Sequence, residues 1–191
     1  MRRGKRIIVL APILTAALVG NANLAIPYWV ELEHKYVSAS KFEIDIPPKG
    51  WRLKAPVEDE LIFTRDGLSL QSLKIGCRAI EKEFPFTKKK LAKEMRVEQV
   101  AEVIIDDFSL NPMISDLHVT ENGTADVGGR IGFKIIYSYQ TKDKLKKEGI
   151  YYGALVDQWY YYIYFEAPAR HYFPRDQSTF EKIKETFKIT L

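Results

Sequence analysis

The chain has 191 residues, one cysteine and a formal net charge of +4. This length fits one globular domain, and a content of 46% hydrophobic and 28% charged residues excludes wholesale disorder. A single cysteine excludes an internal disulfide and a multi-cysteine metal site. The isoelectric point of about 9.0 suggests an anionic partner only if the basic residues lie in the folded domain.

The N-terminus has the pattern of an export signal. Residues 1–6 carry four basic residues, and residues 7–20 are uncharged and mostly apolar. A basic head followed by a short apolar stretch is typical of secretory signal peptides. We therefore assign residues 1–25 to an export signal or an N-terminal membrane anchor, and residues 26–40 to a lead-in segment.

The residues after the apolar stretch leave two outcomes open. Residues 18–20 resemble the start of a bacterial lipobox, but Asn21 occupies the position of the lipid-bearing cysteine and has no thiol. A signal peptidase could cleave after Ala22, because Gly20 and Ala22 are small residues at the −3 and −1 positions. Alternatively, residues 7–30 carry no charge and are long enough to span a bilayer, so they could associate the protein with a membrane.

The basic character of the chain belongs to this N-terminal segment. Residues 1–25 contain four of the 29 basic residues and none of the 25 acidic residues, so the remainder holds 25 of each. The exported part is therefore neutral, and we expect no nucleic-acid partner.

The first predicted elements of the domain are strands. Residues 42–46 alternate between apolar and acidic side chains, as in a half-buried strand. Residues 60–65 and 68–75 flank Asp66-Gly67, a pair typical of hairpin turns because both residues tolerate positive φ. The apolar spacing then shifts, which predicts a β-bulge near Gln71-Ser72.

Two amphipathic helices and four more strands are predicted in the rest of the chain. One helix covers residues 97–110, and a final helix covers about 176–188 with Asp176 or Ser178 as its N-cap. The apolar face of the first helix is formed by residues at helical spacing: Val97, Val100, Ala101, Ile104 and Phe108. The strands cover 116–121, which ends at a turn at Asn122-Gly123, and 131–139, 149–156 and 159–166.

Strand 159–166 is apolar or aromatic on both faces, which is typical of a central strand covered by helices on both sides. The elements therefore predict an α+β domain over residues 41–191, in which an antiparallel β-sheet is sandwiched between helices as an α/β/α sandwich. The row formed by Trp159, Tyr161 and Phe165 could instead stack on a sugar. We expect it to be core, because both faces are equally aromatic.

Several motifs occur in a familiar order. They include FEIDIPPKGW (42–51), VGGRIGFKIIYSY (127–139) and an Ala167-Pro168 turn before the last helix. Over about residues 41–190 the chain resembles bacterial envelope proteins with the PsbP-like fold, which the PsbP subunit of photosystem II and a eukaryotic Ran-binding release factor share. The resemblance implies an antiparallel sheet between helices and a role in binding or assembly. Many such relatives resemble lipoproteins, a pattern from which Asn21 departs.

The sequence contains no motif for catalysis or cofactor binding. His34, His118 and His171 lack the spacing of zinc ligands, and Cys77 is expected to be a small buried residue without an activating base. The glycines of segment 128–132 open a strand, so we expect them to permit a bulge or a close backbone contact rather than to bind phosphate. We predict no catalytic residue, no metal ligand and no cofactor.

Aromatic and cationic residues in predicted loops form the candidate binding surface. They lie at one end of the predicted sheet: Trp51, Arg170, His171, Tyr172 and Phe173. We expect an exported protein of the periplasm or cell envelope that binds an unidentified envelope protein or small ligand without catalysing a reaction. The alternative is an envelope hydrolase or metal-dependent enzyme whose site is built from sequence-distant residues.

Overall fold

The structure is a computed structural model that describes residues 29–31, 36–38, 41–57 and 59–190. The predicted export signal and most of the predicted lead-in segment lie outside the described residues. Within the described residues, no helix is long and apolar enough to cross a bilayer.

An eight-stranded antiparallel sheet forms the centre of the described part of the chain, in the order β1–β4–β5–β6–β10–β9–β8–β7. Its strands are β1 (Trp29–Glu31), β4 (Arg52–Val57), β5 (Glu60–Thr64), β6 (Ser72–Ala79), β7 (Ile114–Val127), β8 (Arg130–Thr141), β9 (Lys146–Val156) and β10 (Trp159–Pro168). Three further strands of the described ranges form a second, smaller sheet in the order β11–β3–β2. They are β2 (Tyr36–Ser38), β3 (Phe42–Asp45) and β11 (Lys188–Ile189).

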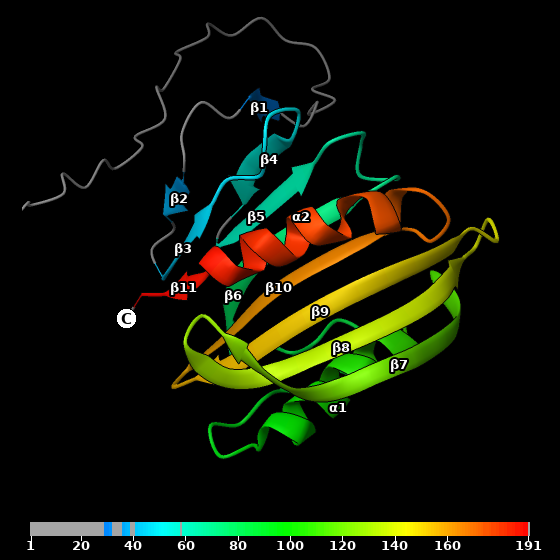
Figure 1. Cartoon of the computed structure of the whole chain (residues 1–191). Helices are drawn as coiled ribbons and strands as arrows, with labels where there is room; N and C mark the ends of the chain where they lie inside the picture. The colour runs from blue at the N-terminus through cyan, green and yellow to red at the C-terminus, as the bar shows by residue number, and fades with distance from the viewer. Residues whose placement is uncertain (1–28, 32–35, 39–40, 58, 191) are drawn as a thin grey trace, which may run out of the picture.

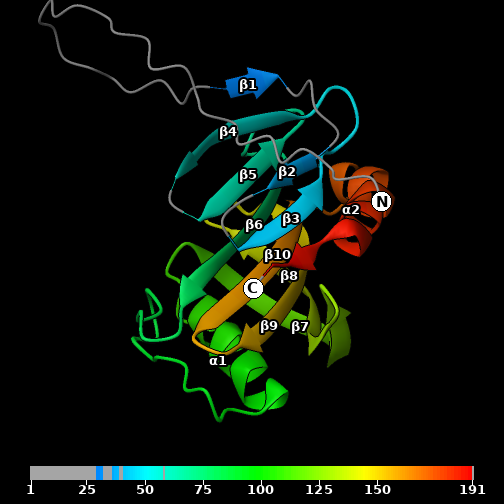
Figure 2. The ribbon, with the colours of Figure 1, turned by 90° about the vertical axis from the view of Figure 1, so that its left-hand side faces the viewer.

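Helices α1 (Val97–Ser109) and α2 (Tyr172–Thr186) lie on opposite faces of the large sheet (Figure 1, Figure 2). Strand β10 lies between β6 and β9. Its odd-numbered side chains pack into the core on the α2 face, and its even-numbered side chains pack into the core on the α1 face. This arrangement confirms the predicted α/β/α sandwich and the central position of strand 159–166.

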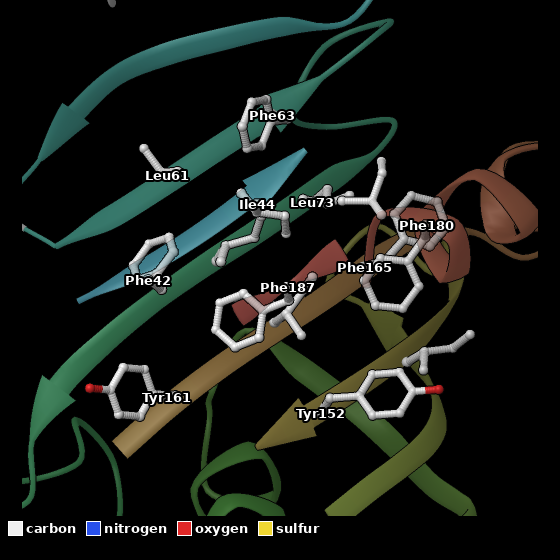
Figure 3. Packing of buried hydrophobic residues seen from close by; sticks show 14 of the residues in the cluster. Phe42, Ile44, Leu61, Phe63, Leu73, Tyr152, Tyr161, Phe165, Phe180 and Phe187 are labelled. Atoms are coloured by element: carbon white, nitrogen blue, oxygen red, sulfur yellow. The ribbon is translucent and has the colours of Figure 1, made fainter. Parts of the chain in front are cut away.

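Aromatic and aliphatic side chains pack together in the core on the α2 face (Figure 3). Phe165 of β10 is fully buried and lies 5.7 Å from Phe173 and 5.6 Å from Phe180 between ring centroids. Phe42 of β3 lies 5.6 Å from Phe187, just after α2. The alternation predicted for residues 42–46 is therefore confirmed, since it directs Phe42 into this core.

Helix α1 confirms the predicted amphipathic segment. Val100, Ala101 and Ile104 are buried against the sheet, because residues at helical spacing share one face. At its N-terminus the Gln99 side chain accepts the backbone N–H of Arg96 at 2.9 Å, which satisfies one of the free donors of the first turn.

The hairpin of β5 and β6 is present, but its connection is longer than predicted. β5 ends at Thr64 and β6 begins at Ser72. The connection is closed by Gln71, whose backbone N–H donates to the Gly67 carbonyl at 3.0 Å and whose side chain accepts the Asp66 N–H at 2.9 Å. From Ser72 onward β6 pairs regularly with β10, so the predicted bulge at 71–72 is wrong.

The predicted turn at Asn122-Gly123 is also wrong. Both residues lie inside β7, which continues to Val127 and pairs with β8. The chain turns instead at Gly128 and Gly129, whose φ angles are 63° and 80°. Two successive positive φ angles match the twist of a two-residue hairpin, and glycine adopts them without strain.

Helix α2 begins four residues earlier than predicted. Its first residue is Tyr172 and the N-cap position is His171, so neither Asp176 nor Ser178 is the cap. The Asp176 side chain is only 2% exposed and accepts hydrogen bonds from the Gln71 and Arg175 side chains, which explains why a typical capping residue occurs inside the helix.

Candidate functional site

The predicted binding residues lie at one end of the large sheet, around the start of α2. Strand register brings the start of β4, the end of β5, the start of β6 and the end of β10 to this end. Trp51 and Phe173 are 4% and 6% exposed and belong to the same core. Tyr172 is half-buried, while Arg170 and His171 are exposed, so only these three side chains are accessible to a partner.

A charged network fastens this end of the sheet to α2. The Asp176 carboxylate accepts the Gln71 side-chain amide at 2.5 Å and the Arg175 guanidinium at 2.6 Å, and Arg65 lies 3.6 Å away. Arg175 also pairs with Asp66. The hydrogen bond to Asp176 raises the pKa of Arg175. Arg65, Asp66 and Gln71 lie on the connection between β5 and β6, and Arg175 and Asp176 lie on α2. The network therefore holds segment 65–71 against α2.

A cavity of about 240 Å³ opens on the other face of the sheet, beside α1. Its walls come from α1, β5, β6, β9, β10 and residues 84–85. Four tyrosines line it, Tyr151 from β9 and Tyr160, Tyr162 and Tyr164 from β10. We call this feature the tyrosine cavity.

Glycines on the neighbouring strands let these rings lie across the sheet. Tyr162 is in register with Gly76 on β6 and Gly153 on β9. A Cβ at Gly76 would lie 2.6 Å from the Tyr162 hydroxyl, and one at Gly153 would overlap the Tyr160 hydroxyl. Because any larger residue would collide with a ring, the two glycines make room for the tyrosines.

Gly132 shows a related close approach between strands. A Cβ at this residue would overlap the Gly153 carbonyl oxygen of β9. The close backbone contact predicted for the glycines of segment 128–132 is therefore confirmed at Gly132.

The hydroxyl groups in the cavity are held by protein partners. Tyr162 donates to the Glu60 carboxylate at 2.7 Å, and Tyr160 donates to the Tyr151 hydroxyl at 3.0 Å. Burial raises the pKa of all four cavity tyrosines, including Tyr164. They therefore stay protonated at physiological pH and act as neutral hydrogen-bonding groups.

Arg78 supplies a positive charge to the cavity wall. Its Nη2 donates to the backbone carbonyls of Lys82 at 2.6 Å and Glu83 at 2.8 Å, and its guanidinium lies 4.2 Å from the centre of the Phe84 ring. This stacking is a cation–π contact. Since a guanidinium has five N–H donors, Arg78 retains donors beyond these two bonds.

Glu60 and Asp107 supply carboxylates from distant parts of the chain. The Asp107 side chain of α1 is buried and accepts the backbone N–H groups of Phe86 at 2.8 Å and Thr87 at 3.0 Å. Glu60 accepts the Tyr162 hydroxyl. A carboxylate offers about four acceptor positions, so both can accept further hydrogen bonds.

The cysteine and the described histidines lie in different environments. Cys77 is buried in the core on the α2 face, as predicted, and burial raises its pKa to about 11. His118 and His171 are exposed, and His34 lies outside the described residues. In that same part of the chain, no three His, Cys, Asp or Glu side chains are grouped to hold a metal ion.

The tyrosine cavity was not predicted from the sequence. The row considered for ligand stacking was the odd-numbered one, and its members Tyr161 and Phe165 are fully buried in the core. The cavity uses the even-numbered row, in which positions 160, 162 and 164 are all tyrosine. Three tyrosines in one row were a signal of a polar site. A buried tyrosine hydroxyl needs a hydrogen-bond partner, and phenylalanine would fill a purely apolar core without one.

Comparisons with known proteins identify the fold. No family model and no curated protein matches the chain. Among solved structures, cyanobacterial PsbP (CyanoP) from Synechocystis sp. PCC 6803 has a TM-score of 0.53 and 13% identity, with 91% of this chain and 99% of that chain covered. LpqN, described as involved in cell envelope biogenesis of Mycobacterium tuberculosis, has a TM-score of 0.56 and 14% identity, with 86% and 91% covered.

The Ran-binding protein Mog1p of Saccharomyces cerevisiae has a TM-score of 0.52 and 8% identity, with 85% of this chain and 94% of that chain covered. The chain therefore has the PsbP-like fold that its motifs suggested. At these identities the likeness concerns the fold alone.

Proposed function

We propose that the protein is a non-catalytic binding protein of the bacterial cell envelope and that the tyrosine cavity is its ligand site. The cavity carries this proposal, because an aromatic hollow with a few convergent polar groups is the usual composition of a small-molecule site. Its volume of about 240 Å³ is below the roughly 300–1,000 Å³ of sites for drug-sized ligands. It suits a small ligand or one end of a larger one.

The proteins that share the fold support a binding role. LpqN is described as involved in cell envelope biogenesis, and Mog1p as a Ran-binding protein. A shared fold does not transfer a function by itself. The proteins make a binding role reasonable, and the cavity indicates where binding would occur.

The N-terminal sequence supports the proposed location. Residues 1–25 combine a basic head with a short apolar stretch, the pattern of a secretory signal. We expect cleavage after Ala22 and a domain that works in the periplasm or envelope. The uncharged residues 7–30 provide the alternative of a membrane anchor.

Arg170, His171 and the accessible part of Tyr172 form a second candidate surface, suited to a protein partner. They are adjacent at the sheet end, and arginine and tyrosine are enriched in protein interfaces. Crosslinking in intact cells tests this surface with the variants Arg170→Ala and His171→Ala. Recovery of the same partners from both variants and the wild type would exclude it.

A hydrolase is the alternative function, because the cavity contains two carboxylates. Glu60 and Asp107 both line it, and glycoside hydrolysis uses such a pair. Both carboxylates instead accept hydrogen bonds from the protein, which supports a structural role for them. Turnover of glycoside substrates that is lost in both Glu60→Gln and Asp107→Asn would favour the hydrolase.

An amide-resolved NMR titration with a library of small neutral, anionic and cationic compounds tests the binding proposal. We expect at least one compound to shift amides of β10, β9 and α1 that border the cavity. Tyr164→Ala should abolish these shifts, and Tyr172→Ala, a half-buried tyrosine outside the cavity, should leave them unchanged. No shifts, or shifts confined to residues 170–173, would contradict the proposal.

A further inference from the structure

The geometry of the tyrosine cavity specifies the chemistry of its ligand. We propose that it binds a neutral saccharide, with one pyranose ring packed against the tyrosine rings and its hydroxyl groups bonded to the cavity wall. This inference rests on the proposed function, since it assumes that the cavity is the ligand site.

Tyrosine rings of similar orientation pack against one another in the cavity. The ring planes of Tyr151 and Tyr164 differ by 16°, those of Tyr151 and Tyr162 by 23°, and those of Tyr162 and Tyr164 by 38°. The ring centroids of Tyr151 and Tyr164 are 5.1 Å apart, so these two rings stack on each other. Gly76 makes room for the third ring, that of Tyr162. Tyr151 is buried within this group, so the half-buried rings of Tyr162 and Tyr164 are the ones that a flat apolar partner would contact.

A pyranose ring is such a partner. One face of the ring presents several C–H groups, whose hydrogens carry a partial positive charge. The face of an aromatic ring is negative, so the two surfaces attract each other while apolar area is removed from water. Tyr162 and Tyr164 are half-buried, which leaves part of each ring for this contact.

The polar groups of the wall match hydroxyl groups. Each sugar hydroxyl donates one hydrogen bond and accepts others, so a saccharide needs donors and acceptors in the same site. Arg78 supplies donors, and Glu60 and Asp107 supply acceptors. The hydroxyls of Tyr160 and Tyr162 already donate within the protein, so they can accept from a ligand. A ligand without hydroxyls would desolvate the remaining donor and acceptor positions of these groups without pairing them, which costs free energy.

The charges disfavour an ionic ligand. The charged residues that line the cavity are one guanidinium and two carboxylates, and each already bonds to the protein. An anion such as phosphate would meet both carboxylates. A cation such as a quaternary ammonium group would meet Arg78, and Lys74 at the edge, whose Nζ lies 5.5 Å from the Tyr164 ring centre. A neutral ligand avoids both repulsions.

Saturation-transfer NMR on the purified protein tests this inference. The probes are methyl glucoside, methyl galactoside, N-acetylglucosamine, maltose and cellobiose, with inorganic phosphate and tetramethylammonium as ionic comparators. We expect at least one saccharide to receive saturation from aromatic protons at its ring C–H groups. Tyr164→Ala should weaken its affinity by about tenfold or more, and Tyr172→Ala should not change it.

The variants separate stacking from loss of fold. Circular dichroism checks that Tyr164→Ala is folded, and Tyr164→Leu replaces the ring by an apolar side chain if it is not. Tyr162→Phe keeps the ring and removes the hydroxyl, so it should weaken binding less than Tyr164→Leu. Saccharide binding that is unaffected by both Tyr164 variants would overturn the inference.

The comparators separate this inference from the proposed function. If phosphate or tetramethylammonium shifts the amides around the cavity and no saccharide does, the saccharide inference is wrong and the ligand site stands. If no probe shifts these amides and the compound library shifts none either, the ligand site is wrong as well.

Discussion

Two glycines control whether the cavity tyrosines can occupy their places. Gly76 and Gly153 lie on the strands on either side of β10, where a Cβ would strike Tyr162 or Tyr160. Neither glycine has a positive φ angle. Their role is therefore to leave space and not to allow an unusual backbone conformation.

We predict that Gly76→Ala destabilises the protein and disturbs the cavity. The new methyl group would lie 2.6 Å from the Tyr162 hydroxyl and 2.9 Å from the Asp59 carbonyl oxygen, and such overpacking typically costs about 1–3 kcal/mol. Urea denaturation measures the change in the free energy of unfolding. Gly123→Ala is the matched control, because nothing lies within 4 Å of its Cβ position. A similar loss in both variants would contradict the steric explanation.

We predict that Cys77 is unreactive in the native protein near neutral pH. It is the single cysteine of the chain, and burial raises its pKa from 9.0 to about 11. Because the thiolate is the reactive form, alkylation of the native protein should rise with a midpoint near pH 11 and that of urea-unfolded protein near its ordinary pKa. Equal alkylation rates for native and unfolded protein at neutral pH would contradict burial of the thiol.

The same shift predicts the direction of a stability change with pH. The folded protein holds the Cys77 proton more tightly than the unfolded chain does, so this contribution is complete below pH 9 and is lost as the pH rises toward 11. Denaturation of wild type and Cys77→Ala over this range measures it. The difference in unfolding free energy between the two should shrink as the pH rises. A constant or growing difference would contradict the assignment.

At the scale of elements, α1 forms one wall of the cavity and also holds the segment that leads into it. Asp107 accepts two backbone N–H groups from residues 86 and 87, while its neighbour Asp106 pairs with Lys89 on the surface at 2.6 Å. The two adjacent aspartates therefore have different roles. Asp107 holds residues 86 and 87 beside the cavity, and Asp106 forms an ion pair at the solvent-exposed surface.

We predict that Asp107→Ala lowers the free energy of unfolding by about 1–3 kcal/mol, because two part-buried N–H groups lose the charged acceptor that the buried carboxylate provides. Asp106→Ala should cost about 0–1 kcal/mol, as expected for a surface ion pair. Hydrogen exchange should also show faster exchange of the Phe86 and Thr87 amides in Asp107→Ala only. Equal effects of the two substitutions would contradict this division of roles.

The periodicity of the sequence predicted the elements themselves. Apolar alternation located residues 42–46, and helical spacing located α1, because both patterns report which side chains leave water. The turns were harder to predict, since Asn122-Gly123 is a strong local signal that long-range pairing with β8 overrides. The bulge predicted at Gln71 failed for a similar reason, because this side chain bonds to the distant Asp176.

The site was harder to predict than the fold because it depends on strand register. Tyr162, Gly76 and Glu60 come from three strands, and only their pairing places the tyrosine hydroxyl over the glycine and against the carboxylate. The sequence predicted a surface at Trp51 and residues 170–173, where Trp51 and Phe173 are core residues. An aromatic residue in a predicted loop does not reveal whether its ring faces solvent or the core.

At the scale of the whole molecule, charge and location are linked. The basic residues in excess all lie in residues 1–25, and the remainder has equal numbers of basic and acidic residues. We predict that the protein recovered from cells begins at Asn23 and has an isoelectric point near neutrality, because cleavage after Ala22 removes the basic head. N-terminal sequencing and isoelectric focusing of the envelope fraction measure both. Protein that retains Met1 would contradict cleavage and support an anchor.

The whole fold separates two faces with different roles. The α2 face is a packed hydrophobic core fastened by the Asp176 network. The α1 face holds the tyrosine cavity because α1 packs mainly against β7, β8 and β9. The half-buried tyrosines of β10 lie beyond this contact. The sheet thus has a packed core on one side and the proposed ligand site on the other.

A crystal structure of the protein soaked with a saccharide that binds in solution tests the central claim most directly. The account predicts one pyranose ring in the tyrosine cavity, face to face with Tyr162 or Tyr164 and with its hydroxyls bonded to Glu60, Arg78 or Asp107. A saccharide bound beside Arg170 and His171, with the tyrosine cavity unoccupied, would contradict it.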